Sequence, residues 1–187
     1  MTLPIVVGVT GATGVVYGVE LLKALKNLGI PTHLIISETG LRTLSLELDM
    51  APGDVRALAS VSHSNKDLAA AVASGSFQTA GMIVSPCSVK TLSGIANGYA
   101  ENLLIRAADV TLKERRPLVL MFRETPLHLG HLRLMTRAAE IGAIILPPMP
   151  AFYHRPETLG DVVRQGVGRA LDQLGIAHDL CRRWSGP

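Results

Sequence analysis

The chain has 187 residues, of which 48% are apolar and 18% carry a charge, a composition typical of a folded globular protein. Its net charge is +3 and it has no lysine- or arginine-rich run, which argues against nucleic acid as a partner. The two cysteines, Cys87 and Cys181, are too few for a disulfide framework or a zinc motif. We therefore expect a single domain over residues 1–187, in a reducing, cytoplasmic setting and with no membrane-spanning segment.

Short apolar runs alternate with helix-like segments along the chain. Strands are predicted at 5–9, 32–36, 80–84, 118–122 and 143–146. Helices are predicted at 17–28, 41–47, 52–60, 89–96, 103–115, 132–141 and 159–174. The strands are apolar throughout, which suits strands buried on both faces. The alternation predicts an α/β fold, a three-layer domain with a mostly parallel sheet.

Small, polar or turn-forming residues follow each predicted strand. In open α/β sheets, ligands bind outside the carboxyl ends of the strands, so these loops are the candidates for a site. Any one of them could be an ordinary loop, but five such ends on one sheet edge favour a ligand site. The segments are Thr10–Gly14, Ser37, Ser85–Ser88, Arg123–Pro126 and Pro147–Tyr153.

The glycines Gly8, Gly11 and Gly14 follow or end the first strand. Their spacing allows a backbone to approach a phosphate at a helix N-terminus, with a structural tight turn as the alternative interpretation. It is not the dinucleotide fingerprint, and the second strand ends in Ser37 rather than in an acidic residue for a ribose hydroxyl. Both observations disfavour NAD.

Charged residues occur in two further places. Arg106 and Lys113 are seven apart on a predicted helix and share a face, which is either a solvated surface or a cationic wall for a phosphate. Arg123 can grip a phosphate with its planar guanidinium, and the adjacent Glu124 is a candidate acid or base.

Metal and thiol chemistry have weak support. His128 and His131 are spaced for a shared metal but have no third ligand at a convincing distance, so we expect helix-start or interface residues and no metal. Cys87 is a possible nucleophile, yet no histidine or asparagine partner can be identified, and buried cysteines are common.

Four motifs in chain order resemble those of one family, the UbiX-type flavin prenyltransferases, which include proteins once called phenolic-acid decarboxylase subunits. The similarity runs from Val6 to Trp184. The motifs are Ser85–Gly94, Ala107–Leu120, Arg123–Leu127 and Pro147–His154.

The resemblance implies a flavodoxin-like, Rossmann-type fold assembled as a dodecamer. It implies transfer of a dimethylallyl group from dimethylallyl phosphate to N5 and C6 of reduced FMN, without a metal. The product, prenylated FMN, would serve a UbiD-type decarboxylase, for instance in ubiquinone biosynthesis.

The resemblance also implies roles for individual residues. FMN, bound between subunits, would contact Gly11, Ala12, Thr13, Ser37, Ser88, Val89, Lys90, Thr91 and Arg123. The prenyl phosphate would meet Arg106, Lys113, Tyr153 and Arg169, with Trp184 near the prenyl group. Lys113, Tyr153 and Arg169 would therefore act in catalysis together with Glu47 and Glu124 as acid/base residues. Thr13 departs from the usual serine, keeping the hydroxyl and adding a methyl group.

Two alternatives remain open. One is a flavin-dependent cysteine decarboxylase, although Pro150–Tyr153 stands where such enzymes have a methionine-rich motif and His63 is the only histidine near the expected catalytic position. The other is a non-catalytic FMN carrier subunit of a decarboxylase.

Overall fold

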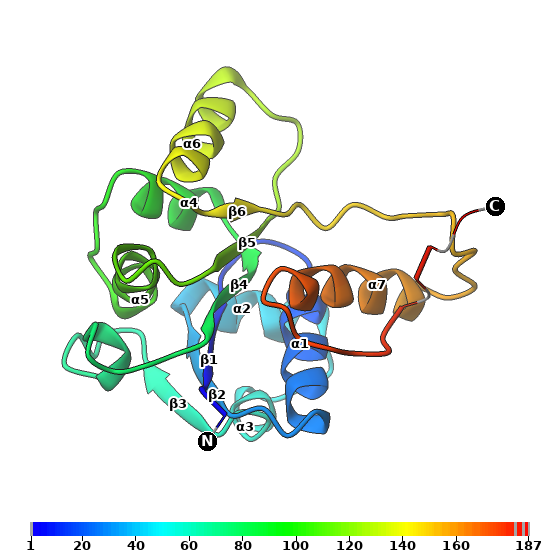
Figure 1. Cartoon of the computed structure of the whole chain (residues 1–187), viewed down its shortest axis with the longest axis horizontal. Helices are drawn as coiled ribbons and strands as arrows, with labels where there is room; N and C mark the ends of the chain where they lie inside the picture. The colour runs from blue at the N-terminus through cyan, green and yellow to red at the C-terminus, as the bar shows by residue number, and fades with distance from the viewer. Residues whose placement is uncertain (1, 182, 185, 187) are drawn as a thin grey trace.

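A single sheet of six parallel strands forms the centre of the molecule (Figure 1). The computed structural model describes residues 2–181, 183, 184 and 186. The strand order is β3-β2-β1-β4-β5-β6. The strands are β1 (Ile5–Val9), β2 (Thr32–Ile36), β3 (Val61–Ser64), β4 (Gly81–Cys87), β5 (Leu118–Phe122) and β6 (Ile144–Ile145).

Helices cover both faces of the sheet and give the three layers. One face packs on α1 (Val15–Asn27), α2 (Glu38–Glu47), α3 (Pro52–Arg56) and α7 (Leu159–Asp172). The other packs on the short 3-10 helix η1 (Ala71–Ala73), α4 (Val89–Ala96), α5 (Leu103–Lys113) and α6 (Leu129–Glu140). Strands β1, β4 and β5 are buried along their whole length, as their apolar sequences predict.

The α1 helix lies unusually close to the sheet because of one glycine. A Cβ on Gly18 would overlap the carbonyl oxygen of Ser85 at the end of β4. Only a residue without a side chain lets the helix backbone approach the strand this closely. This contact holds the N-terminus of α1 beside the carboxyl edge of the sheet.

The predicted fold class is confirmed, although several element bounds differ, most clearly at β3, α3 and β4. β3 was not predicted: its sequence has a single apolar residue, Val61, because an edge strand is not buried on both faces. α3 ends at Arg56 rather than at residue 60, since the chain must turn into β3. β4 extends to Cys87, past an irregular pairing between Val84 and Cys87 that accommodates Pro86.

Residues 147–158 form an extended arm between β6 and α7 that reaches toward the side where the C-terminus lies (Figure 1). Its large side chains are exposed, including Met149, Phe152 and Tyr153. No helix in the described ranges is both long enough and apolar enough to cross a membrane.

Candidate functional site

A cleft of about 940 Å³ opens at the carboxyl edge of the sheet. Its walls come from the turn after β2, the end of β3, the turn after β4 and the start of α5. This is the edge at which ligands of open α/β sheets bind. Its lining includes Ser37, Thr39, His63, Asn65, Ser88, Lys90, Thr91 and Asn102.

Three helix N-termini meet at this cleft, and each is capped by a short polar side chain. The Ser37 hydroxyl accepts the amide of Gly40 (3.0 Å) at α2, and the Ser88 hydroxyl accepts that of Thr91 (3.4 Å) at α4. Asn102 Oδ1 caps α5. The first amides of a helix lack intrahelical partners and carry positive dipole ends, so the cleft is suited to an anion such as a phosphate.

Cationic side chains add to this field. Arg42, Arg56, Lys66 and Lys90 line the cleft. Lys90 pairs with Glu101 at 2.8 Å and Arg42 with Glu38 at 3.0 Å, and both carboxylates also belong to the lining. Four cations therefore face two anions, and the cleft keeps a positive excess.

Thr10, at the end of β1, fixes the turn after β4. Its hydroxyl donates to the carbonyl of Pro86 at 2.7 Å and accepts the amide of Ser88 at 2.9 Å. The glycine loop that follows packs against the start of α2, because a Cβ on Gly11 would lie 2.5 Å from Thr39 Cβ. Gly11, Ala12 and Thr13 are not among the residues that line the cleft, and Thr13 is exposed.

Glu47 closes the N-terminus of α1. The helix cap is Gly14, in a left-handed conformation (φ 92°), which has no side chain to accept a hydrogen bond. The carboxylate of Glu47, from the last residue of α2, accepts the amides of Gly14 at 2.8 Å and Val15 at 3.1 Å instead. Sequence reasoning assigned Glu47 to acid/base chemistry but did not foresee this contact between helices.

Two histidines on neighbouring strands form a pair that the sequence did not reveal. His33 Nδ1 and His63 Nε2 are 2.9 Å apart, and the ring of Phe77 lies 5.0 Å from that of His33. Burial lowers the pKa of both imidazoles, and His63 lowers that of His33 further. His63 also lines the cleft, where the lowered pKa favours the neutral imidazole.

Arg123 and Glu124 follow β5 beside the turn after β4. The Arg123 amide donates to the carbonyl of Cys87 at 3.0 Å, and the Glu124 carboxylate accepts the amide of Thr125 at 2.9 Å. Both side chains are partly exposed. Cys87 is completely buried and burial raises the pKa of its thiol, so it is unsuited to act as a nucleophile.

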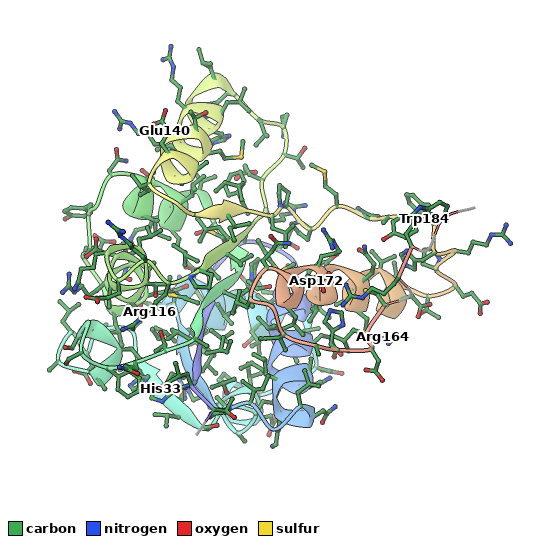
Figure 2. The ribbon with its side chains drawn as sticks, in the orientation of Figure 1. His33, Arg116, Glu140, Arg164, Asp172 and Trp184 are labelled. Carbon is green, nitrogen blue, oxygen red and sulfur yellow. The ribbon has the colours of Figure 1, made fainter. Side chains whose placement is uncertain are left out.

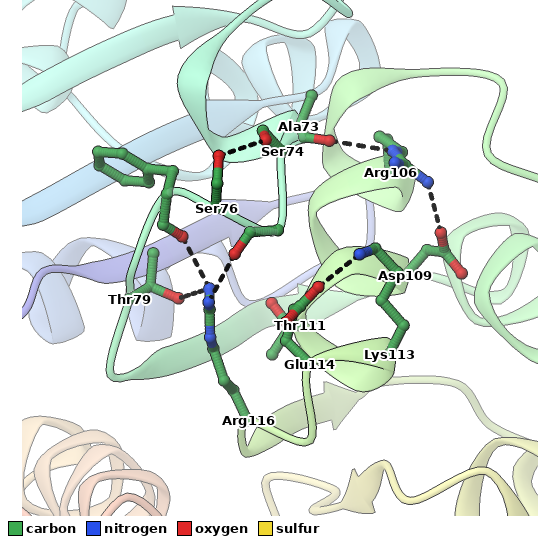
Figure 3. Close-up of polar contacts among 12 residues, drawn as sticks. Ala73, Ser74, Ser76, Thr79, Arg106, Asp109, Thr111, Lys113, Glu114 and Arg116 are labelled. Carbon is green, nitrogen blue, oxygen red and sulfur yellow. Dashed lines mark hydrogen bonds and ion pairs between the residues drawn. The ribbon is translucent and has the colours of Figure 1, made fainter.

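Arg106 and Lys113 lie away from the cleft, on the face of α5 that packs on the loop around η1 (Figure 3). Arg106 donates to the carbonyl of Ala73 at 3.2 Å and to Asp109 at 2.8 Å, and Lys113 pairs with Glu114. Within one chain these two cations therefore lie next to the η1 loop, an arrangement that neither the solvated surface nor the phosphate wall expected from their spacing describes.

Tyr153, Arg169 and Trp184 belong to a third region, the arm, α7 and the C-terminal tail. The rings of Tyr153 and Trp184 are 5.8 Å apart, edge to face, and both are more than half exposed. Arg169 pairs with Asp172 at 2.9 Å.

His128 accepts two amides as the cap of α6. This contact agrees with a helix-start role. The described part of the chain has no cluster of three potential metal ligands.

The comparisons with known proteins identify the family. The Flavoprotein family matches residues 2–158. The flavin prenyltransferase UbiX of Escherichia coli K12 is 60% identical over 185 residues, covering 97% of this chain and 98% of its own length. This chain belongs to the UbiX family of flavin prenyltransferases.

Solved structures of the family share the fold closely. The crystal structure of AnUbiX (PadA1) in complex with FMN and dimethylallyl pyrophosphate has a TM-score of 0.98 at 47% identity and covers 100% of this chain and 99% of that one. A dodecameric FMN-dependent UbiX-like decarboxylase from Escherichia coli O157:H7 has a TM-score of 0.96 at 51% identity, covering 98% and 100%. The family assignment made from the sequence motifs and the flavodoxin-like fold are thus confirmed.

Proposed function

We propose that this protein is a flavin prenyltransferase that joins a dimethylallyl group from dimethylallyl phosphate to N5 and C6 of reduced FMN. The product, prenylated FMN, serves a UbiD-type decarboxylase. The observation that carries the proposal is the 60% identity to a flavin prenyltransferase over 97% of the chain. FMN is the flavin named for two solved relatives, and one of them also holds dimethylallyl pyrophosphate.

The cleft fits the phosphate of FMN. Three capped helix N-termini converge on it, its cations outnumber its carboxylates, and Ser37, Ser88 and Thr91 offer hydroxyl groups. We place the FMN phosphate there, with Val89 and Lys90 in the same turn and Arg123 beside it. Gly11, Ala12 and Thr13, in the loop after β1, would contact the flavin from the side of α2. Reduced FMN supplies the nucleophilic ring atoms of the reaction.

The residues for the prenyl donor come from three separate regions of one chain. Arg106 and Lys113 lie on α5, Tyr153 on the arm, and Arg169 on α7. We propose that neighbouring copies in a dodecamer bring these regions to one FMN. The exposed aromatic arm and the dodecameric relative support this assembly.

The chemistry then follows from charge and solvent exclusion. Arg106, Lys113 and Arg169 hold the phosphate dianion as it leaves, which is electrostatic stabilisation by fixed donors. Tyr153 and Trp184 offer π faces to the allylic cation, and their bulk keeps out water that would quench it. Glu47 and Glu124 are the acid/base residues that move the proton released on ring closure.

An assembled site can be tested by mixing inactive variants. Lys113→Ala and Arg123→Ala alter different regions, so each alone should lose activity. Co-assembly of the two should restore some intact sites and part of the wild-type rate of flavin prenylation, with Lys23→Ala as a surface-lysine control. If the mixture stays as inactive as its components while both remain dodecameric and bind FMN, the two residues act in the same copy and the shared site is refuted.

The carrier alternative makes the opposite prediction. A carrier would need FMN binding alone, so Lys113→Ala would support the partner decarboxylase as well as wild type does. A cysteine decarboxylase is disfavoured because Pro150–Tyr153 replaces the methionine-rich motif and Cys87 is buried. The cytoplasmic location and the single domain over 1–187 stay predictions, as do the residue roles.

A further inference from the structure

Asp172, the last residue of α7, lies at the centre of a charged cluster at the C-terminal tail, the Asp172 cluster. Its Oδ2 accepts from Arg169 Nη1 at 2.9 Å, and its Oδ1 accepts from Arg183 Nη1 at 2.6 Å. Oδ1 also lies 3.2 Å from Nε2 of His178. The side chain of Asp172 is only 15% exposed. Figure 2 labels Asp172 on α7 and Trp184 on the C-terminal tail.

The tail segment before Trp184, which includes His178 and Cys181, packs on α7. The side chain of His178 is completely buried, and its Nδ1 accepts the amide of Leu180 at 3.2 Å. Nε2 of the same ring lies 3.2 Å from Asp172 Oδ1 and 3.3 Å from Arg183 Nη2, so His178 sits between the carboxylate and the tail arginine. A Cβ on Gly168 would lie 2.7 Å from His178 Cε1 and 3.1 Å from Cys181 Sγ, so the tail occupies the space a larger residue would fill.

The cluster carries a net positive charge. Burial would raise the pKa of Asp172, but the hydrogen bonds from Arg183 and His178 outweigh it and hold the pKa below its usual value. One carboxylate therefore faces two guanidinium groups. Among the described residues, Arg169 makes its ion pair through Nη1, and no described acceptor lies on Nε or Nη2. Those two donors are available to an anion.

We propose that Asp172 is a positioning residue that couples prenyl-donor binding at Arg169 to docking of the tail that carries Trp184. The carboxylate holds one end of the Arg169 guanidinium, so the other end stays aimed at the donor phosphate. The same carboxylate anchors Arg183, and the next residue, Trp184, is thereby held against Tyr153. This inference rests on the proposed function, because it takes Arg169 and Trp184 as parts of the donor site.

Trp184 provides a direct readout because it is the single tryptophan of the chain. Acrylamide quenching of its fluorescence in FMN-loaded protein measures tail docking without any turnover. Asp172→Asn removes the negative charge at the centre of the Asp172 cluster. Asp179→Asn makes the same chemical change at an exposed tail residue and serves as the matched control. Gly168→Ala leaves every charge in place but pushes on His178 and Cys181.

We expect Asp172→Asn and Gly168→Ala each to raise the acrylamide quenching constant of Trp184. Each should also raise the KM for dimethylallyl phosphate by about tenfold or more, while FMN affinity stays at the wild-type value. Asp179→Asn should match wild type in the quenching constant, the KM and the FMN affinity. The proposal is overturned if Asp172→Asn behaves like Asp179→Asn, if quenching rises without a change in KM, or if FMN affinity falls in parallel. If Asp172→Asn does not fold, Gly168→Ala decides by the same criteria. A wild-type protein that forms no prenylated flavin counts against the proposed function. The quenching constants of the variants still show whether Asp172 holds the tail that carries Trp184.

Discussion

Replacing Glu47 separates its structural role from its proposed role in proton transfer. Its carboxylate accepts two amides, from Gly14 and Val15, at the start of α1. Loss of a helix cap costs about 1 kcal/mol, and the exposed position of Glu47 limits the added dipole term to about 0.5 kcal/mol. Glu47→Ala should therefore destabilise the fold by roughly 1–1.5 kcal/mol, or about 2–6 °C in Tm for a chain of this size.

Glu47→Gln keeps an oxygen that can accept one amide, so its Tm should fall by about half as much. It cannot take up a proton, so the single-turnover rate of flavin prenylation should drop by about 100-fold or more. Thermal unfolding of the FMN-loaded protein and rapid-quench kinetics measure the two effects separately. Glu20→Gln, at a partly exposed position of α1 that pairs with Lys23, makes the same chemical change away from the cap and is the control.

The capping role and the proton-transfer role of Glu47 can each be refuted separately. A Glu47→Ala protein that unfolds at the wild-type temperature would show that the cap contact contributes nothing. A Glu47→Gln protein whose prenylation rate stays within about twofold of wild type would remove Glu47 from the proton-transfer step.

Four further outcomes are expected. Gly18→Ala should destabilise the protein by about 3 kcal/mol, seen as a lower Tm, because its Cβ would overlap a backbone carbonyl of β4; an unchanged Tm would contradict the close approach. Arg116→Ala should remove the bonds of 2.8 and 2.9 Å to carbonyls of the loop after η1 and cost about 2–3 kcal/mol, and hydrogen exchange of residues 74–79 should rise. The hydrogen bonds from the Thr158 side chain and backbone lower the pKa of Asp161 from 3.8 to about 2, so its stabilising contribution is complete above pH 3.8 and is lost as the pH falls toward 2; Asp161→Asn should flatten the acid limb of Tm against pH. Cys87 should resist iodoacetamide in the native protein and react only on unfolding, because it is fully buried; rapid native labelling would contradict this.

Most of the fold could be predicted because its strands are buried on both faces. Five apolar runs identified five of the six strands, and the order of strands and helices required a parallel sheet. β3 was not predicted because its residues Val61–Ser64 are largely exposed at the edge of the sheet, where a strand needs no apolar pattern. α2 was predicted three residues late, since its start at Glu38 depends on the Ser37 cap and not on an apolar face.

The cleft was predictable in outline, and the rest of the site was not. Ser37 and Ser88 follow strands, and strand ends of a parallel sheet converge, so their meeting at the cleft follows from topology. The contact of Glu47 with the start of α1 depends on how two helices pack, which no local pattern encodes. Arg106 and Lys113 share a helix face as predicted, but that face packs on the η1 loop of the same chain. The proposed assembly of the donor site from several copies could not be derived from the periodicity of one chain.

The most direct test is the mass of the flavin after reaction. The protein is incubated without oxygen with reduced FMN and dimethylallyl phosphate, quenched with acid, and the released flavin is examined by mass spectrometry. The account predicts FMN heavier by one five-carbon prenyl unit, with one inorganic phosphate released for each flavin modified. Unmodified FMN together with intact dimethylallyl phosphate, from protein that binds both, would contradict it.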